Sequence, residues 1–176
     1  MRGLSESTHF KVISIPSAVG YCREQKANDH TIGLITGCFD ILHYGHIRLF
    51  RFAKRRVHRL LIGCDNDESI RASKGLERPL FSIDIRLEQL SEMESVDRVF
   101  AINGFIRFGD QASHAAWGKI AETIRPSAIV TCERSDSFAE HKRAMARSLG
   151  IEYIPFQDDE SVSTTSIVSS LMQRVE

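Results

Sequence analysis

Residues 32–56 read IGLITGCFDILHYGHIRLFRFAKRR. The first five, IGLIT, form a short apolar and β-branched run that predicts a buried strand. From His46 to Arg56, apolar residues such as Ile47 and Phe50 recur at helical spacing, which predicts an amphipathic helix. A strand that ends in a turn of small residues and leads directly into a helix is the first half of a βαβ unit.

The same alternation continues to the end of the chain. We expect a doubly wound parallel sheet of Rossmann-like type, a three-layer α/β/α sandwich, because parallel strands need helical crossovers of one hand. Residues 1–30 are expected to form an arm and a helix, and residues 31–176 a single domain. The further strands are predicted at 58–64, 97–102, 127–132 and 152–156, and the further helices at 67–73, 83–93, 115–124, 138–150 and 163–175.

Composition excludes several classes of protein. Among 176 residues, 23 are Lys or Arg and 23 are Asp or Glu, so the chain has no overall field to attract nucleic acid or a membrane. No apolar run approaches the roughly 20 residues that span a bilayer. The four cysteines are dispersed without a CxxC pair, which argues against a zinc site and favours reduced thiols in a cytoplasm.

The turn after the first strand has the features of a phosphate site. Gly37 and Cys38 are small, so a ligand could approach the backbone. His46 heads a helix, whose first N–H groups and positive dipole end attract anions, and His43 lies three residues before it on the same side. Gly45 removes a side chain between them. The competing interpretation, two incidental histidines at a helix start, is equally open on these grounds.

Gly37 to His46, GCFDILHYGH, resembles the HxGH signature of the nucleotidyltransferase superfamily. That superfamily includes glycerol-3-phosphate cytidylyltransferase and the adenylyltransferase domain of bacterial heptose-phosphate enzymes. Three further blocks resemble the same family in the same order, namely LLIGCDNDESIRASKGLERP at 60–79, RLEQLSEMESVDRV at 86–99 and SVSTTSIVSSL at 161–171. The resemblance therefore covers most of the chain.

The resemblance implies an enzyme in which a phosphorylated acceptor attacks the α-phosphorus of a nucleoside triphosphate and releases pyrophosphate. It implies that His43 and His46 stabilise the reacting phosphorus and that Lys74 neutralises phosphate charge. Magnesium would arrive with the triphosphate, and family members are commonly homodimers. The nucleotide-binding residues implied are Gly37, Cys38, Phe39, Asp40, Gly45, Arg86, Ser163, Thr164 and Thr165.

Plainer interpretations of these residues remain open. Lys74 alone would be a solvated loop lysine, and Arg86 an ordinary surface arginine of a helix. Serine and threonine at 163–165 are also common helix N-caps. An attacking phosphate oxygen is already anionic, so the chemistry needs no serine or cysteine nucleophile.

Two departures from the family pattern bear on the substrate. Glycerol-phosphate cytidylyltransferases carry an Arg-Thr-x-Gly-Ile run where residues 158–162 read DDESV, which favours ATP over CTP. The glycine-rich turn expected after the fourth strand is replaced by Cys132-Glu133-Arg134-Ser135. A cytidylyltransferase acting on glycerol 3-phosphate or another phospho-alcohol, and a nucleotide-binding protein without turnover, therefore stay as alternatives to a sugar-phosphate adenylyltransferase.

Overall fold

The computed structural model describes residues 9–104, 111–157 and 167. Its five strands form one parallel sheet in the order β3-β2-β1-β4-β5. This order reverses direction at β1, as in a doubly wound fold, so the predicted fold class is confirmed. The strands are β1 (Ile32–Gly37), β2 (Arg59–Asp65), β3 (Arg98–Ile102), β4 (Ala128–Cys132) and β5 (Glu152–Phe156).

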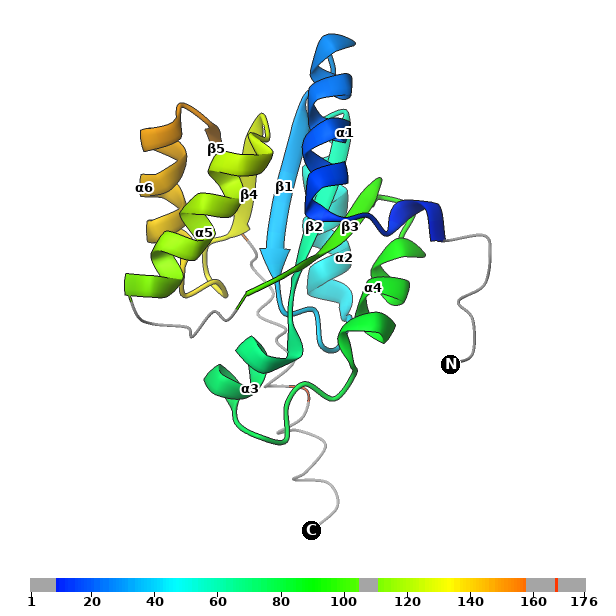
Figure 1. Ribbon diagram of the computed structural model, residues 1–176, viewed down its shortest axis with the longest axis vertical. Coiled ribbons are helices and arrows are strands. Elements are labelled where there is room, and N and C mark those ends of the chain that lie inside the picture. Colours follow the sequence, from blue (N-terminus) through cyan, green and yellow to red (C-terminus); the bar gives the residue numbers. More distant parts are fainter. Residues whose placement is uncertain (1–8, 105–110, 158–166, 168–176) are drawn as a thin grey trace.

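Helices cover both faces of the sheet. One apolar cluster joins α2 and α4 to one face, and two others join α1, α5 and α6 to the opposite face. Figure 1 shows α5 and α6 beside β4 and β5, with α3 below the carboxyl ends of the strands. The helices are α1 (Ile15–Ala27), α2 (Tyr44–Lys54), α3 (Asp67–Lys74), α4 (Ile83–Ser91), α5 (Gln111–Ile124) and α6 (Ala139–Leu149), preceded by a 3₁₀ turn at His9–Lys11.

The sheet is apolar through its middle and polar at its carboxyl edge. Leu61 and Ile129 pack on the face covered by α1, α5 and α6. Because strand side chains alternate between faces, the later residues Asp65 and Thr131 point to that same face. Both are buried. The core therefore gives way to buried polar groups at the end of the sheet where doubly wound folds bind ligands.

Most predicted elements agree with the structure to within a few residues. Helix α2 begins at Tyr44, two residues earlier than predicted, and His43 is its N-cap. Helix α5 begins at Gln111 rather than at residue 115. The helix predicted at 163–175 lies outside the described residues except for Ile167, which is helical.

The helix expected before the first strand is α1. It is packed into the same core as the sheet, since Ala18 and Cys22 lie in one cluster with Leu34 and Leu61. A backbone hydrogen bond of 2.9 Å from Ile13 to Val99 fixes the segment before it along β3.

Over the ranges 9–104 and 111–157, none of the helices has the length and apolar character that crossing a membrane requires.

Candidate active site

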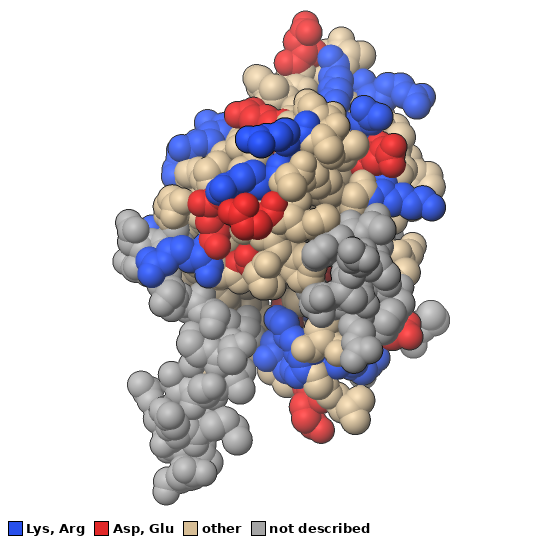
Figure 2. Space-filling model, turned by 90° about the vertical axis from the view of Figure 1, so that its left-hand side faces the viewer, with Lys and Arg blue, Asp and Glu red and all other residues tan. Residues whose placement is uncertain are grey.

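A cavity of about 380 Å³ opens at the carboxyl ends of β1 and β4. This is the switch point of the sheet, where the connections from the two strands run to opposite faces. The cavity is lined by the ends of β1, β2 and β4, by the first turn of α2, by the end of α3, and by residues of α5 and α6. Figure 2 shows a hollow on the face of α5 and α6, above the lysines and arginines at the level of α3.

The two histidines of the signature meet at the start of α2. His46 lines the cavity, and His43 packs against it with 3.9 Å between ring centroids. The Nδ1 of His46 accepts a hydrogen bond from the backbone N–H of His43 at 3.4 Å. A neutral imidazole that accepts at Nδ1 carries its proton on Nε2. His46 can therefore act as a hydrogen-bond donor through Nε2.

The surroundings of His46 hold it neutral. Burial, followed by the charges of His43 and Lys74, lowers the pKa of His46 to about 3. It is therefore a neutral donor at physiological pH. The helix N-terminus and Lys74 can compensate the charge of a bound phosphate on this side of the cavity.

Phe39 fixes the ring of His46. The two rings meet edge to face with 5.3 Å between centroids, and Phe39 also contacts Phe50 of α2 at 5.7 Å. Phe39 has a backbone φ of 49°, a left-handed conformation that turns the chain sharply. A Cβ on Gly37 would lie 3.3 Å from the Phe39 ring. The small residue at Gly37 thus makes room for Phe39 as well as bordering the cavity.

Lys74 reaches the cavity from the last residue of α3. Gly75 follows it with a φ of 97°, a conformation that ends the helix and that side-chain-bearing residues rarely adopt. Lys74 is exposed, and its positive charge contributes to the lowered pKa of His46. The structure therefore brings His46 and Lys74, from two different helices, to the same cavity.

Asp40 holds the loop that follows α3. Its side chain is 2% exposed. One carboxylate oxygen accepts from the backbone N–H groups of Leu80 and Phe81 at 2.7 and 3.0 Å. The other accepts from the Arg78 guanidinium at 2.5 Å. With both oxygens engaged, Asp40 lines the cavity chiefly as the anchor of this loop.

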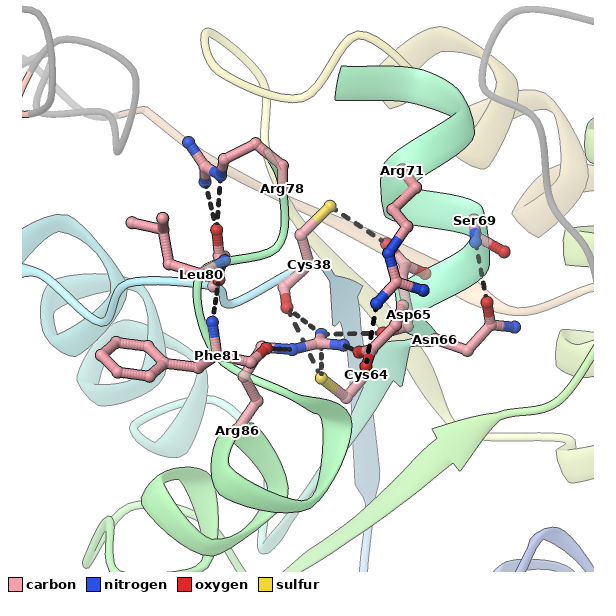
Figure 3. Close-up of polar contacts among 12 residues, drawn as sticks. Cys38, Cys64, Asp65, Asn66, Ser69, Arg71, Arg78, Leu80, Phe81 and Arg86 are labelled. Atoms are coloured by element: carbon pink, nitrogen blue, oxygen red, sulfur yellow. Dashed lines mark hydrogen bonds and ion pairs between the residues drawn. The ribbon is translucent and has the colours of Figure 1, made fainter. Parts of the chain in front are cut away.

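Arg86 is completely buried, which neither interpretation from the sequence anticipated. Figure 3 shows its guanidinium lying between the ends of β1 and β2, reached from α4. It donates to the backbone carbonyl oxygens of Cys38 and Asp65 at 2.6 and 2.7 Å. It also pairs with Asp67 at 2.6 Å, at the start of α3. Arg86 therefore joins the two strand ends and α3, and any effect on a ligand is transmitted through them.

Cys38 is an inert thiol rather than a nucleophile. Burial, and then the neighbouring charge of Asp65, raise the pKa of Cys38 to about 12. Its Sγ donates to Asp65 at 3.5 Å, as Figure 3 shows. At neutral pH the group is a protonated thiol that borders the cavity.

Several polar or aromatic residues of the cavity wall were not predicted as site residues from the sequence, among them Asp65, Thr131, Lys142 and Trp117. Lys142 is 5% exposed and lies in the buried stripe of α6, between Ala139 and Met145. A lysine at a position that helical spacing assigns to the core was the available signal. Asp65 gave a similar one, as an acid at the end of a strand that is otherwise apolar. Trp117 packs in the core and also borders the cavity.

The altered turn after β4 is built from side-chain pairs instead of glycines. Asp136 accepts from Lys142 at 2.6 Å and from the backbone N–H of Phe138 at 2.8 Å. Glu133 pairs with Arg143 and accepts from Gln157 at 2.6 Å. Cys132, Ser135 and Asp136 all line the cavity. The turn therefore closes one side of the cavity even though it lacks glycine.

The other residues predicted from the sequence lie on α2 or outside the described part of the chain. Gly45 is the second residue of α2. Ser163, Thr164 and Thr165 lie outside the described residues, as does the 158–162 stretch that favoured ATP. Among residues 9–104, 111–157 and 167, no group of three or more His, Cys, Asp or Glu side chains is placed to hold a metal ion.

Curated relatives match the chain over much of its length. The bifunctional protein HldE of Coxiella burnetii is 34% identical over 93 residues, which is 53% of this chain and 20% of the relative. The bifunctional protein HldE of Halorhodospira halophila is 26% identical over 165 residues, 93% of this chain and 32% of the relative. The chain thus spans only about a fifth to a third of the length of these relatives.

Solved structures share the fold. A lipopolysaccharide core biosynthesis protein from Thermoplasma volcanium has a TM-score of 0.56 at 25% identity, covering 74% of this chain and 99% of its own. Pantoate-beta-alanine ligase from Francisella tularensis has a TM-score of 0.64 at 13% identity, covering 90% and 76%, a likeness of fold alone. The sequence model described as cytidylyltransferase-like matches residues 34–170, from β1 to beyond Ile167. The chain therefore belongs to the cytidylyltransferase-like family.

Proposed function

We propose that this protein is a nucleotidyltransferase that transfers AMP from ATP to a sugar phosphate and releases pyrophosphate. One observation carries the proposal: His46 and Lys74, from different helices, line one cavity at the N-terminus of α2. Membership of the cytidylyltransferase-like family supports the reaction class. The relatives named HldE and the resemblance to heptose-type adenylyltransferases support the choice of substrates.

In the proposed reaction, no protein side chain needs to form a covalent bond with the substrate. An anionic phosphate oxygen of the acceptor forms a bond to the α-phosphorus, and the bond from that phosphorus to the bridging oxygen of pyrophosphate breaks. The attacking oxygen has no proton to lose, so no general base is required. Catalysis then consists of positioning and of stabilising the charge that builds up on the phosphate oxygens.

Each residue has a part in this scheme that follows from its position. His46 would donate from Nε2 to a phosphate oxygen, its orientation fixed by Phe39 and by the backbone of His43. As a neutral donor in the protein without ligand, it offers a phosphate oxygen a directional hydrogen bond. Lys74 would supply the mobile positive charge, and the first N–H groups of α2 would supply fixed partial charges. His43, which the resemblance also implies at the reacting phosphorus, is not among the described residues that line the cavity, and it would act by packing against the His46 ring.

Magnesium would be held by phosphate oxygens and water, as this ion prefers. The family reaction uses it to neutralise the triphosphate. Ser163, Thr164 and Thr165 are proposed to add hydroxyl and N–H donors to the triphosphate.

Measuring pyrophosphate release tests the function. The protein is incubated with magnesium and each of ATP, CTP, GTP and UTP against a panel of phosphorylated sugars and alcohols. We expect release with ATP and a sugar phosphate, and none when EDTA removes the metal. Release with CTP and glycerol 3-phosphate alone would replace the proposal with a cytidylyltransferase. Nucleotide binding without release in any pairing would favour a binding protein.

Two further expectations belong to this proposal. All four cysteines are free thiols, which supports a reducing, cytoplasmic compartment. A homodimer is expected from the family resemblance, and the molecular mass in solution, measured by light scattering, tests it.

A further inference from the structure

The wall of the cavity differs in charge from one side to the other. His46 and Lys74 stand on the side formed by α2 and α3. Across the strand ends, β2, β4 and α6 contribute Asp65, Thr131 and Lys142. We call these three residues, together with Asp136, the polar wall. The proposed phosphate chemistry uses the first side and leaves the polar wall without a role.

Asp65 is a buried carboxylate in the cavity wall, and its two oxygens differ in their hydrogen bonding. Its side chain is 1% exposed, and its Oδ2 accepts from the Cys38 thiol at 3.5 Å. Within the described part of the chain, its Oδ1 has no hydrogen-bond partner. Burying an unsatisfied carboxylate costs free energy, so a fold that keeps one in a cavity wall has an acceptor ready for a ligand.

Thr131 presents a second unsatisfied group on the same face of the sheet. It is 2% exposed, and its Oγ1 also lacks a hydrogen-bond partner among residues 9–104, 111–157 and 167. Leu34 of β1 pairs with Ile129, and Thr131 lies two residues further toward the carboxyl end of β4. Strand β1 separates β2 from β4, which places Thr131 and Asp65 on either side of it.

Lys142 sets the charge of this region. Its Nζ pairs with Asp136 at 2.6 Å and lies 3.4 Å from the carbonyl oxygen of Thr36. Two carboxylates and one ammonium group therefore share the polar wall. A phosphate would meet excess negative charge there, whereas a hydroxyl could donate to Asp65 and exchange a hydrogen bond with Thr131.

We propose that Asp65 and Thr131 bind hydroxyl groups of a sugar ring whose phosphate lies on the His46 and Lys74 side of the cavity. The inference rests on the proposed function, since it assigns the polar end of a phosphorylated substrate to the polar wall. The shared chemistry is a ring bearing adjacent hydroxyls. It has two sources here, the sugar of the acceptor and the ribose of the nucleotide.

Two substitutions test the binding role. Asp65→Asn removes the charge in the same shape, and Thr131→Val removes the hydroxyl in the same shape. Glu68→Gln, an exposed acid of α3, and Thr123→Val, an exposed threonine of α5, are the matched controls. KM and kcat are measured from pyrophosphate release while the sugar phosphate and ATP are varied separately, and thermal melts verify the fold of each variant.

We expect each polar-wall variant to raise the KM of one substrate roughly 10-fold or more, with kcat nearly unchanged. The substrate that responds identifies the source of the ring. Analogues that lack one hydroxyl then confirm the contact: 2′-deoxy-ATP and 3′-deoxy-ATP for ribose, and deoxy-sugar phosphates for the acceptor. A substitution should have little further effect on the analogue that lacks its partner hydroxyl.

Unchanged KM values for both substrates would overturn the inference, and so would equal effects in the controls. A loss confined to kcat would overturn it too. If the wild-type protein releases no pyrophosphate in any pairing, the proposed function fails, and calorimetry of ATP and sugar phosphates tests the polar wall alone. Weaker binding to Asp65→Asn that depends on ligand hydroxyls would then support the inference. Equal affinity for wild type and variant would overturn it.

Discussion

Two connections meet at the cavity, and they are built in different ways. Residues 38–43 join β1 to α2, and residues 133–138 join β4 to α6. In the first, the ring of His46 at the start of α2 contacts both Phe39 and His43, all within eight residues of sequence. In the second, Glu133 and Asp136 are held by Arg143 and Lys142, from one to two helical turns into α6. The first connection is a local motif, whereas the second needs the helix that follows it.

The two connections differ in how well they can be recognised from the sequence. A local motif can be recognised from its spacing, because the residues that shape it lie next to it in the chain. A wall assembled from β2, β4 and α6 has no such local motif, although Asp65, Thr131 and Lys142 are more deeply buried than the histidines. The phosphate side of the cavity could therefore be predicted as a site, whereas Asp65 and Lys142 gave only isolated signals, each a charged residue at a position expected in the core.

We expect the greatest loss of activity from a substitution of His46, where the connection between β1 and α2 enters the helix. His46→Ala removes the Nε2 donor, and we expect kcat for pyrophosphate release to fall roughly 100- to 1000-fold, as for loss of a donor to a transition-state oxyanion. His30→Ala, at the amino end of β1, is the control and should keep its activity. Circular dichroism and a thermal melt should show His46→Ala folded. A folded variant with full turnover would remove His46 from the mechanism.

The next effect tests whether the local connection stands on its own. Arg86→Met should lower the free energy of unfolding by roughly 3 kcal/mol, because it leaves Asp67 and the carbonyls of Cys38 and Asp65 without their buried donor. Urea unfolding measures the change. Arg98→Met, a partly buried arginine of β3, is a comparison that removes fewer contacts. Stability equal to wild type would mean that α2 and its histidines need no support from α4.

A smaller effect is expected for Lys74, whose positive charge lies on the side of the cavity proposed to bind phosphate. Lys74→Ala should reduce kcat/KM roughly 10- to 100-fold, and Lys74→Arg should restore part of it, because either cation can neutralise phosphate charge. Lys119→Ala, an exposed lysine of α5, serves as the control. Rising salt concentration should raise the KM for ATP more strongly in the wild type than in Lys74→Ala. Equal activity of Lys74→Ala and wild type would leave this lysine a solvated surface residue.

The weakest of these effects concerns Asp65 of the polar wall and the pH dependence of the stability of the fold. Burial raises the pKa of Asp65 from 3.8 to about 6, against the opposing influence of Lys142, the Cys38 hydrogen bond and Arg86 and with a further rise from Asp136. Between about pH 4 and 6 the native state therefore binds more protons than the unfolded chain, so the stability of the wild type falls as pH rises through this window. Above it, the buried charge opposes folding.

Asp65→Asn should then be more stable than wild type at pH 7 by roughly 1–3 kcal/mol, and the difference should vanish below about pH 4. Urea unfolding at pH 4 and pH 7 measures both values. Glu68→Gln should show no comparable dependence. A less stable Asp65→Asn at pH 7 would mean that the carboxylate supports the fold. Greater stability with weaker substrate binding would mark Asp65 as a residue kept for function.

Much of the architecture follows from local patterns. The alternation of short apolar runs with amphipathic ones predicted the parallel sheet, since each period of apolar residues fits one kind of element. His46 at the start of α2 was predictable for the same reason, because a helix N-terminus is defined by its own few residues. The shift of that start to Tyr44 came from His43, an N-cap that the pattern alone did not reveal.

The strands, the helices and the position of the histidine pair could be predicted from local sequence patterns, because these features depend on neighbours in the chain. Three other features became visible in the folded molecule: Arg86 is buried between two strand ends, Asp40 anchors residues 78–81, and Asp65 and Thr131 border a common cavity. These facts depend on which residues, 20 to 70 positions apart, the right-handed crossovers bring together at one edge of the sheet. Burial and pairing across that edge are properties of the packed molecule, and no single segment contains them.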